Sequence, residues 1–157
     1  MKRLLTLIGV VATLLLTPTN AKAWGDLYLL NNIWGSWGST DTNPDYKFTK
    51  VNDNEFTYSL DASDYEGDIF WKINTPGDYS GQREIYPDND GQDVGESGYN
   101  AKYDGSYSGK SFKIPHSTNN YTRYTITAKW EGSIWKLKVV GSGGGIYLGV
   151  FGLSSKK

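Results

Sequence analysis

Apolar and polar residues alternate with a period of two along much of the chain, which is the pattern of a β-strand with one buried face. Phe56, Tyr58 and Leu60, for example, fall on one face of a strand. We find no convincing helical period. The alternation predicts strands at residues 26–31, 46–51, 56–60, 67–73, 84–86, 111–114, 124–130 and 134–139.

Turn residues separate these strands and predict how they pair. Asp53-Asn54 joins the second strand to the third, and Glu131-Gly132 joins the last two, so both pairs are expected to form hairpins. Several short alternating strands with turns between them favour a sandwich of two sheets. We therefore expect an all-β fold that consists of a single antiparallel β-sandwich of the immunoglobulin-like kind.

Two glycine-rich segments interrupt the alternation. Residues 77–109 form a connection of a length that is uncommon in compact domains and usually functional or mobile. Residues 141–145 have the composition of a flexible linker. We expect residues 24–140 to form the sandwich. Residues 141–157 are then a linker and short tail, which is either the stub of a second module, an extra strand or a disordered end.

The first 23 residues have the pattern of a signal peptide. Lys2 and Arg3 precede an apolar run from Leu4 to Leu16, and Ala21-Lys22-Ala23 is a small-residue cleavage site. The run is shorter than the roughly 20 residues of a membrane-spanning helix. We expect cleavage before Trp24 and export to the periplasm, the cell surface or the medium. The chain has no cysteine, so it has neither disulfides nor a cysteine-linked lipid anchor.

The charge balance argues against one class of partner. The whole chain carries a formal net charge of −1, and loss of the signal peptide removes three positive residues. Nucleic-acid binding depends on clustered Lys and Arg that neutralise phosphates. We therefore expect no nucleic-acid partner, and no membrane-spanning segment in the mature chain.

Two tryptophans lie where a core position is unfavourable. Trp34 and Trp37 stand among small and polar residues, and Gly35 and Gly38 leave their rings uncrowded. Sugar rings stack their C–H faces on exposed aromatic rings, while their hydroxyls need polar partners at the rim. We take this pair as the leading ligand contacts. The alternative is that one ring caps the end of the sandwich.

The other tryptophans follow the alternation. Trp71 shares a face with Ile69 and Ile73, which favours the core over ligand contact, and Trp130 and Trp135 also share faces with apolar residues. Trp24 carries no such signal. Lys72 points to the opposite face, where it is either a sugar contact or simply solvated.

Three residues of the long connection form a second polar and aromatic cluster. Tyr79, Arg83 and Tyr86 lie near one another in sequence and would complete a sugar site, or they belong to an ordinary surface loop. The following segment is acidic and rich in glycine, which makes it a weak calcium candidate. Its spacing departs from the EF-hand loop, and we expect no other cofactor. The four possible ligands are Asp88, Asp90, Asp93 and Glu96.

The sequence contains little that indicates a catalytic site. The single histidine, His116, is expected to be a solvated loop residue, and the chain offers no cysteine nucleophile and no histidine pair for zinc. The paired carboxylates of a glycosidase cannot be recognised from spacing along the chain. We therefore expect a protein that is not an enzyme.

Three stretches, taken in order, resemble starch-binding modules of the SusE/SusF type from outer-membrane starch-utilisation systems. They are Leu27-Tyr-Leu-Leu followed by Gly35-Ser-Trp-Gly; Phe48 to Leu60; and Ser111-Phe-Lys-Ile-Pro followed by the last two predicted strands. The resemblance implies a starch-binding-domain-like sandwich that grips α-glucan without cleaving it, with Trp37 in the family's glycine-tryptophan loop. This chain lacks the family's lipoprotein cysteine and carries only one full module.

Together these patterns favour non-catalytic binding of a polysaccharide or oligosaccharide, with a starch-like α-glucan as the best guess. Two alternatives stay open. The protein is a secreted structural or adhesin protein whose aromatic residues make protein contacts, because interfaces are also rich in aromatic residues. Otherwise it is a small glycoside hydrolase or an accessory fragment of one.

Overall fold

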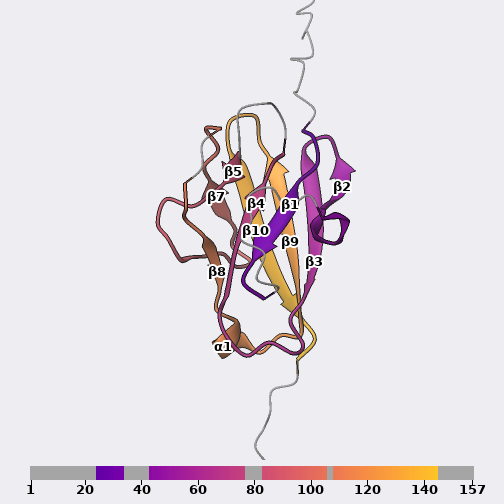
Figure 1. Ribbon diagram of the computed structural model, residues 1–157, viewed down its shortest axis with the longest axis vertical. Coiled ribbons are helices and arrows are strands. Elements are labelled where there is room, and N and C mark those ends of the chain that lie inside the picture. Colours follow the sequence, from indigo (N-terminus) through magenta and orange to yellow (C-terminus); the bar gives the residue numbers. More distant parts are fainter. Residues whose placement is uncertain (1–23, 34–42, 77–82, 106–107, 145–157) are drawn as a thin grey trace, which may run out of the picture.

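A computed structural model of the chain describes residues 24–33, 43–76, 83–105 and 108–144 (Figure 1). The predicted signal peptide, Trp34, Trp37, Tyr79 and the tail after residue 144 lie outside these ranges. No helix among the described residues is long and apolar enough to cross a membrane.

The described strands form two five-stranded sheets, which confirms the predicted all-β sandwich. Apart from the parallel pair β6 and β8, the pairings between strands are antiparallel. The first sheet has the order β1 (Tyr28–Asn31), β4 (Ile69–Asn74), β8 (Phe112–Ile114) and β6 (Gln92–Asp93), with β5 (Glu84–Ile85) also paired to β4. The second has the order β2 (Thr49–Asn52), β3 (Glu55–Asp61), β9 (Arg123–Trp130), β10 (Trp135–Ser142) and β7 (Tyr99–Ala101).

Both predicted hairpins are present. β2 pairs with β3, and β9 pairs with β10 in a register that runs from Trp130 opposite Trp135 to Arg123 opposite Ser142. β10 therefore continues through Gly141 and Ser142, which the sequence analysis assigned to a linker. The reason is that backbone pairing with β9 does not require side chains, so a glycine there does not end the strand.

The core lies between the sheets and is mainly aromatic and branched aliphatic. Trp71 and Trp135 are fully buried in it, as alternation favoured, whereas Trp130 is only half-buried at its edge. Trp24, which carried no signal in the sequence, is 8% exposed and packs edge-on against Tyr103, Trp130 and Trp135. The N-terminal end of the described chain is therefore fixed to the core by an aromatic ring.

Four short elements were not predicted. They are the 3-10 helix η1 (Pro44–Tyr46), β6, β7 and the helix α1 (His116–Asn119). Elements of two to four residues are too short to show a period. The prediction that His116 is a solvated loop residue is wrong. His116 is buried, because α1 places it against Tyr65 and Tyr124.

Candidate functional site

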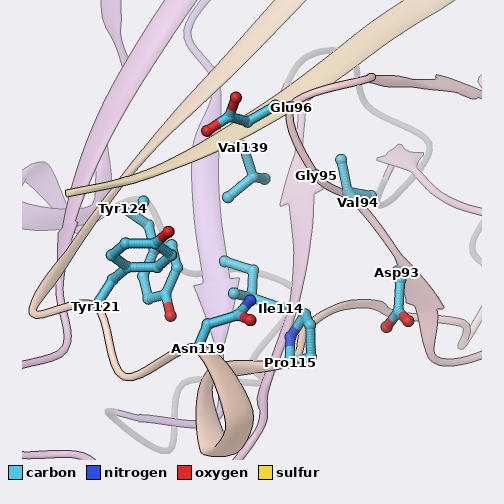
Figure 2. Close-up of a pocket in the computed structure, with 11 residues that line it drawn as sticks. Asp93, Val94, Gly95, Glu96, Ile114, Pro115, Asn119, Tyr121, Tyr124 and Val139 are labelled. Atoms are coloured by element: carbon cyan, nitrogen blue, oxygen red, sulfur yellow. The ribbon is translucent and has the colours of Figure 1, made fainter. Parts of the chain in front are cut away.

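A cleft opens at the end of the sandwich where α1 lies, between the two sheets (Figure 2). It encloses about 250 Å³. Apolar residues of both sheets meet in it: Ile114 comes from β8 and Val139 from β10. The other residues around it are Asp93, Val94, Gly95, Glu96, Pro115, Asn119, Tyr121, Tyr124 and Gly141.

Tyr121 supplies an exposed aromatic ring on one side of this cleft. The residue lies between α1 and β9, and it is 39% exposed. Its ring meets that of Tyr124 edge to face, at 5.9 Å between centroids and 87° between planes. The ring also lies directly against the backbone of Gly141, where a Cβ atom would overlap it. Two neighbours thus hold a ring that solvent reaches.

Tyr124 is itself fixed by a buried hydrogen-bonded chain. His116 Nε2 lies 2.6 Å from the carbonyl oxygen of Tyr65, and Nδ1 lies 2.8 Å from the hydroxyl of Tyr124. A carbonyl only accepts, so Nε2 carries a proton, and in the tautomer with its only proton there the Tyr124 hydroxyl donates to Nδ1. Burial raises the pKa of Tyr124 to about 12. These contacts hold the Tyr124 ring in place beside the cleft.

Polar groups stand around the apolar floor. A turn closed by the Gly98 N–H donating to Gly95 O at 3.1 Å carries Glu96, and the Val139 N–H donates to the same oxygen at 3.2 Å. These bonds hold the turn against β10. Asp93 lies 3.2 Å from the amino group of Lys113. In Figure 2, Glu96 and Asp93 lie far apart on the cleft, and the Asn119 side chain lies between Tyr124 and Pro115. The cleft thus combines an aromatic ring, an apolar floor and polar groups.

Two predicted site residues on β4 are not available to a ligand. Trp71 is 0% exposed and packs on Phe112 at 4.8 Å between ring centroids, so its ring has no free face. Lys72 is 4% exposed and lies 2.8 Å from Glu84 in a buried ion pair. The prediction that Lys72 is solvated or contacts a sugar is therefore wrong. The face of β4 that carries it is also covered, as the complete burial of neighbouring Leu30 shows.

Arg83 and Tyr86 flank β5, which pairs with the last two residues of β4. The Tyr86 hydroxyl donates to Asp104 Oδ2 at 2.8 Å. Arg83 Nε lies beside Gly105, 3.9 Å from the position of a Cβ atom there. Tyr86 lines a second hollow of about 220 Å³ together with Lys102, Tyr103 and Ser133. Tyr79, the third member of the predicted cluster, lies outside the described residues.

The described residue that directly precedes the predicted Trp34–Trp37 segment borders a third hollow. Ile33, which directly precedes Trp34, lines about 290 Å³ of space together with residues 61–65. Asn32 donates to the Tyr65 hydroxyl at 2.8 Å, which holds this end of the chain against the 61–65 turn. The role of the two tryptophans stays a prediction.

The four carboxylates proposed for calcium do not form one site. Among the described residues no three His, Cys, Asp or Glu side chains are arranged to hold a metal. Asp88 pairs with Lys102, whose hydrogen bond lowers the pKa of Asp88. Asp90 accepts from the backbone and hydroxyl of Ser111 at 2.9 Å, which lowers its pKa. These two carboxylates have structural partners, while Asp93 and Glu96 border the cleft.

Comparison with known proteins adds little beyond this geometry. No protein-family model matches the chain, and no curated protein is detectably similar to it in sequence. Among solved structures, the ligand-induced structure of AmyP-SBD, a starch-binding domain, is similar over 92% of this chain and 97% of that chain, with a TM-score of 0.45 and 16% sequence identity. Such a distant likeness does not identify a family or a ligand, so the resemblance to the SusE/SusF type stays a prediction.

Proposed function

We propose that the protein binds a polysaccharide without cleaving it, and that the cleft beside Tyr121 holds part of the glycan chain. One observation carries the proposal: an exposed tyrosine ring is fixed beside an apolar floor, and the carboxylate of Glu96 and the amide of Asn119 line the same cleft. A sugar ring is recognised by this combination, because its C–H face stacks on an aromatic ring while its hydroxyls bond to polar side chains.

A starch-like α-glucan is the ligand that we propose, on the basis of the sequence resemblance. Trp34 and Trp37 are further sugar contacts in this proposal, as the sequence predicts. The signal-peptide pattern of residues 1–23 supports a place outside the cytoplasm, where polysaccharides are encountered. The size of the cleft, about 250 Å³, is below the usual range for a site that encloses a whole small molecule and suits a short part of a long chain.

Affinity electrophoresis tests this function and names the sugar. The protein should migrate more slowly in native gels that contain starch than in gels that contain xylan or β-glucan. Tyr121→Ala should migrate faster than the wild type in starch gels, and Val51→Ala, a change at an exposed position in β2, should not. Equal migration in all gels, together with self-association, would replace this proposal by the structural or adhesin role.

Glycoside hydrolysis is a second candidate, because two carboxylates, Asp93 and Glu96, border the same cleft. Glycosidases place a pair of carboxylates on either side of the scissile bond. The Lys113 amino group at 3.2 Å engages Asp93, which favours binding over hydrolysis. Release of reducing sugar from starch by the wild type, lost in Glu96→Gln and Asp93→Asn, would establish the hydrolase instead.

A further inference from the structure

We propose a second glycan-binding site in the hollow beside Tyr103, at the other end of the sandwich from the Tyr121 cleft. This inference rests on the proposed function, since it assigns the same class of ligand to a second place. The hollow measures about 220 Å³, close to the 250 Å³ of the cleft. Tyr86, Lys102, Tyr103, Asp104, Ser133 and Ile134 line it.

The aromatic side of this hollow is held in place by the core. Tyr103 is half-buried, and its ring meets that of Trp24 at 4.8 Å between centroids and 84° between planes. Tyr86 and Lys102 exchange two backbone hydrogen bonds, of 3.1 and 2.9 Å. The chain segments that carry the two tyrosines are thus fixed to each other before any ligand arrives. A preformed site loses less conformational entropy on binding.

Polar groups complete the hollow in the way that a sugar requires. Asp104 is exposed and accepts a hydrogen bond from the Tyr86 hydroxyl at 2.8 Å. Carboxylates accept up to about four hydrogen bonds in all, and sugar hydroxyls are suitable donors to them. The Ser133 side chain is exposed on the turn between β9 and β10. Lys102, paired with Asp88, adds a positive charge at the rim. Ring, donors and acceptors meet here as they do in the cleft.

The two sites lie at opposite ends of one hairpin. The Tyr121 cleft includes Tyr124 opposite Gly141, at the open end of β9 and β10, whereas Ser133 and Ile134 belong to the turn end. Six residue steps along β9 separate Tyr124 from Trp130, which corresponds to roughly 20 Å. One sugar residue cannot fill both sites. One molecule can therefore hold two glycan chains, or two distant parts of one chain.

Two binding sites on one chain should raise the affinity for a polymer but not for a short oligosaccharide. Simultaneous attachment raises the apparent affinity for a long or insoluble polysaccharide, in general by roughly 10²- to 10⁴-fold over either site alone. A short oligosaccharide gains nothing, because it fills the sites one at a time. Loss of one site should then weaken binding to starch far more than binding to maltoheptaose.

The test uses the mature full-length chain and three variants. Ser133→Arg fills the hollow from an exposed turn position and leaves the core untouched, and Asp104→Ala removes a polar partner. Tyr121→Ala weakens the cleft. Titration calorimetry with maltoheptaose should resolve two binding events per chain for the wild type, and each variant should weaken one of them at least 3-fold and leave the other unchanged. Binding to insoluble starch should fall by at least the same factor in each variant, and thermal unfolding of each variant shows that it is folded.

The outcomes separate the two proposals. One maltoheptaose per chain, bound more weakly by Tyr121→Ala and equally well by Ser133→Arg and Asp104→Ala, overturns the second site and leaves the proposed function standing. Two molecules per chain whose affinities none of the variants changes place both sites elsewhere and overturn the assignment of the hollow. No binding of maltoheptaose or starch by the wild type overturns the inference together with the proposed α-glucan function.

Discussion

The ring of Tyr121 lies so close to the backbone of Gly141 that no side chain fits between them: a Cβ atom at position 141 would overlap Cγ, Cδ2 and Cε2 of the ring. Gly141 is opposite Tyr124 in the β9–β10 register, and the ring of Tyr124 meets the Tyr121 ring edge to face. Two residues from paired strands thus determine where the exposed ring stands. The position of the ring depends on the absence of a side chain at 141.

Gly141→Ala should therefore weaken glycan binding without removing any group that touches the sugar. The added methyl group displaces the Tyr121 ring from its place at the cleft, so we expect a loss of affinity comparable to that of Tyr121→Ala. Gly25→Ala is the matched control, because a Cβ atom there meets nothing within 4 Å. Calorimetry on both variants checks this, and wild-type affinity in Gly141→Ala would show that the ring has no part in binding.

Tyr121→Ala should reduce the affinity for a glycan by roughly 3- to 10-fold, because stacking on an aromatic ring contributes about 0.5–1.5 kcal/mol. Its effect on the free energy of unfolding should be small, since surface changes usually stay within about 0.5 kcal/mol. Val51→Ala, at a residue that is 56% exposed on β2, serves as control for a generic surface change. Equal affinities for the two variants would contradict the stacking role.

Trp24→Ala should destabilise the fold strongly. The ring contacts three aromatic rings at 4.8 to 5.0 Å, and its removal leaves a cavity in the core. Truncation of a large buried aromatic residue costs about 3–5 kcal/mol. Urea unfolding measures the change, and a loss below about 1 kcal/mol would mean that Trp24 does not anchor the N-terminal end.

Asp68 should make stability depend on acid pH. The hydrogen bond from the Ser117 hydroxyl, with smaller help from its backbone N–H, lowers the pKa of Asp68 below its usual value. A depressed carboxyl pKa stabilises the folded state above the unfolded-state pKa of about 4, and this contribution is lost as the pH falls through the folded-state pKa. Asp68→Asn should thus be less stable than the wild type at pH 7 and equally stable at pH 2. Parallel stability curves for the two proteins from pH 7 to pH 2 would contradict this.

Alkaline pH should destabilise the protein through two tyrosines, the buried Tyr124 and the half-buried Tyr58. Burial raises the pKa of Tyr58 and of Tyr124 to about 12. The unfolded chain loses these protons near pH 10, so the folded state is penalised progressively from about pH 10 up to about pH 12. Tyr124→Phe should show a shallower decline across this range. It should also be less stable at pH 7, because the His116 Nδ1 atom loses its donor. An unchanged alkaline slope would contradict the assignment.

The fold was largely predictable because one face of most strands is buried. Alternation located both long hairpins and favoured the core for Trp71 and Trp135, since burial of one face imposes a period of two on the sequence. Lys72 is an exception, because alternation placed it on the solvent-facing side of β4. That face of β4 is also covered, and the ion pair with Glu84 balances the charge of Lys72 there. The sequence pattern does not show which strand is covered on both faces.

The described part of the candidate site was hardly predictable. Tyr121 precedes β9 without any period, and its exposure depends on Gly141, which is twenty residues away in the chain and was assigned to a linker. A contact between a glycine and an aromatic residue that are far apart in the chain produces no periodic pattern in the sequence. Arg83 and Tyr86 lie three positions apart in the chain, on either side of β5, but the hydrogen-bond partner of Tyr86, Asp104, comes from a distant turn.

The most direct test of the proposed glycan cleft is a titration of the isotope-labelled protein with maltoheptaose, followed through backbone amide chemical shifts. We expect the largest changes at residues 119–121, 139–141 and 95–96, which surround the cleft, and a second set at residues 102–104 and 133–134. Changes confined to other parts of the chain, or no changes at millimolar maltoheptaose, would contradict the assignment of this cleft to a glycan.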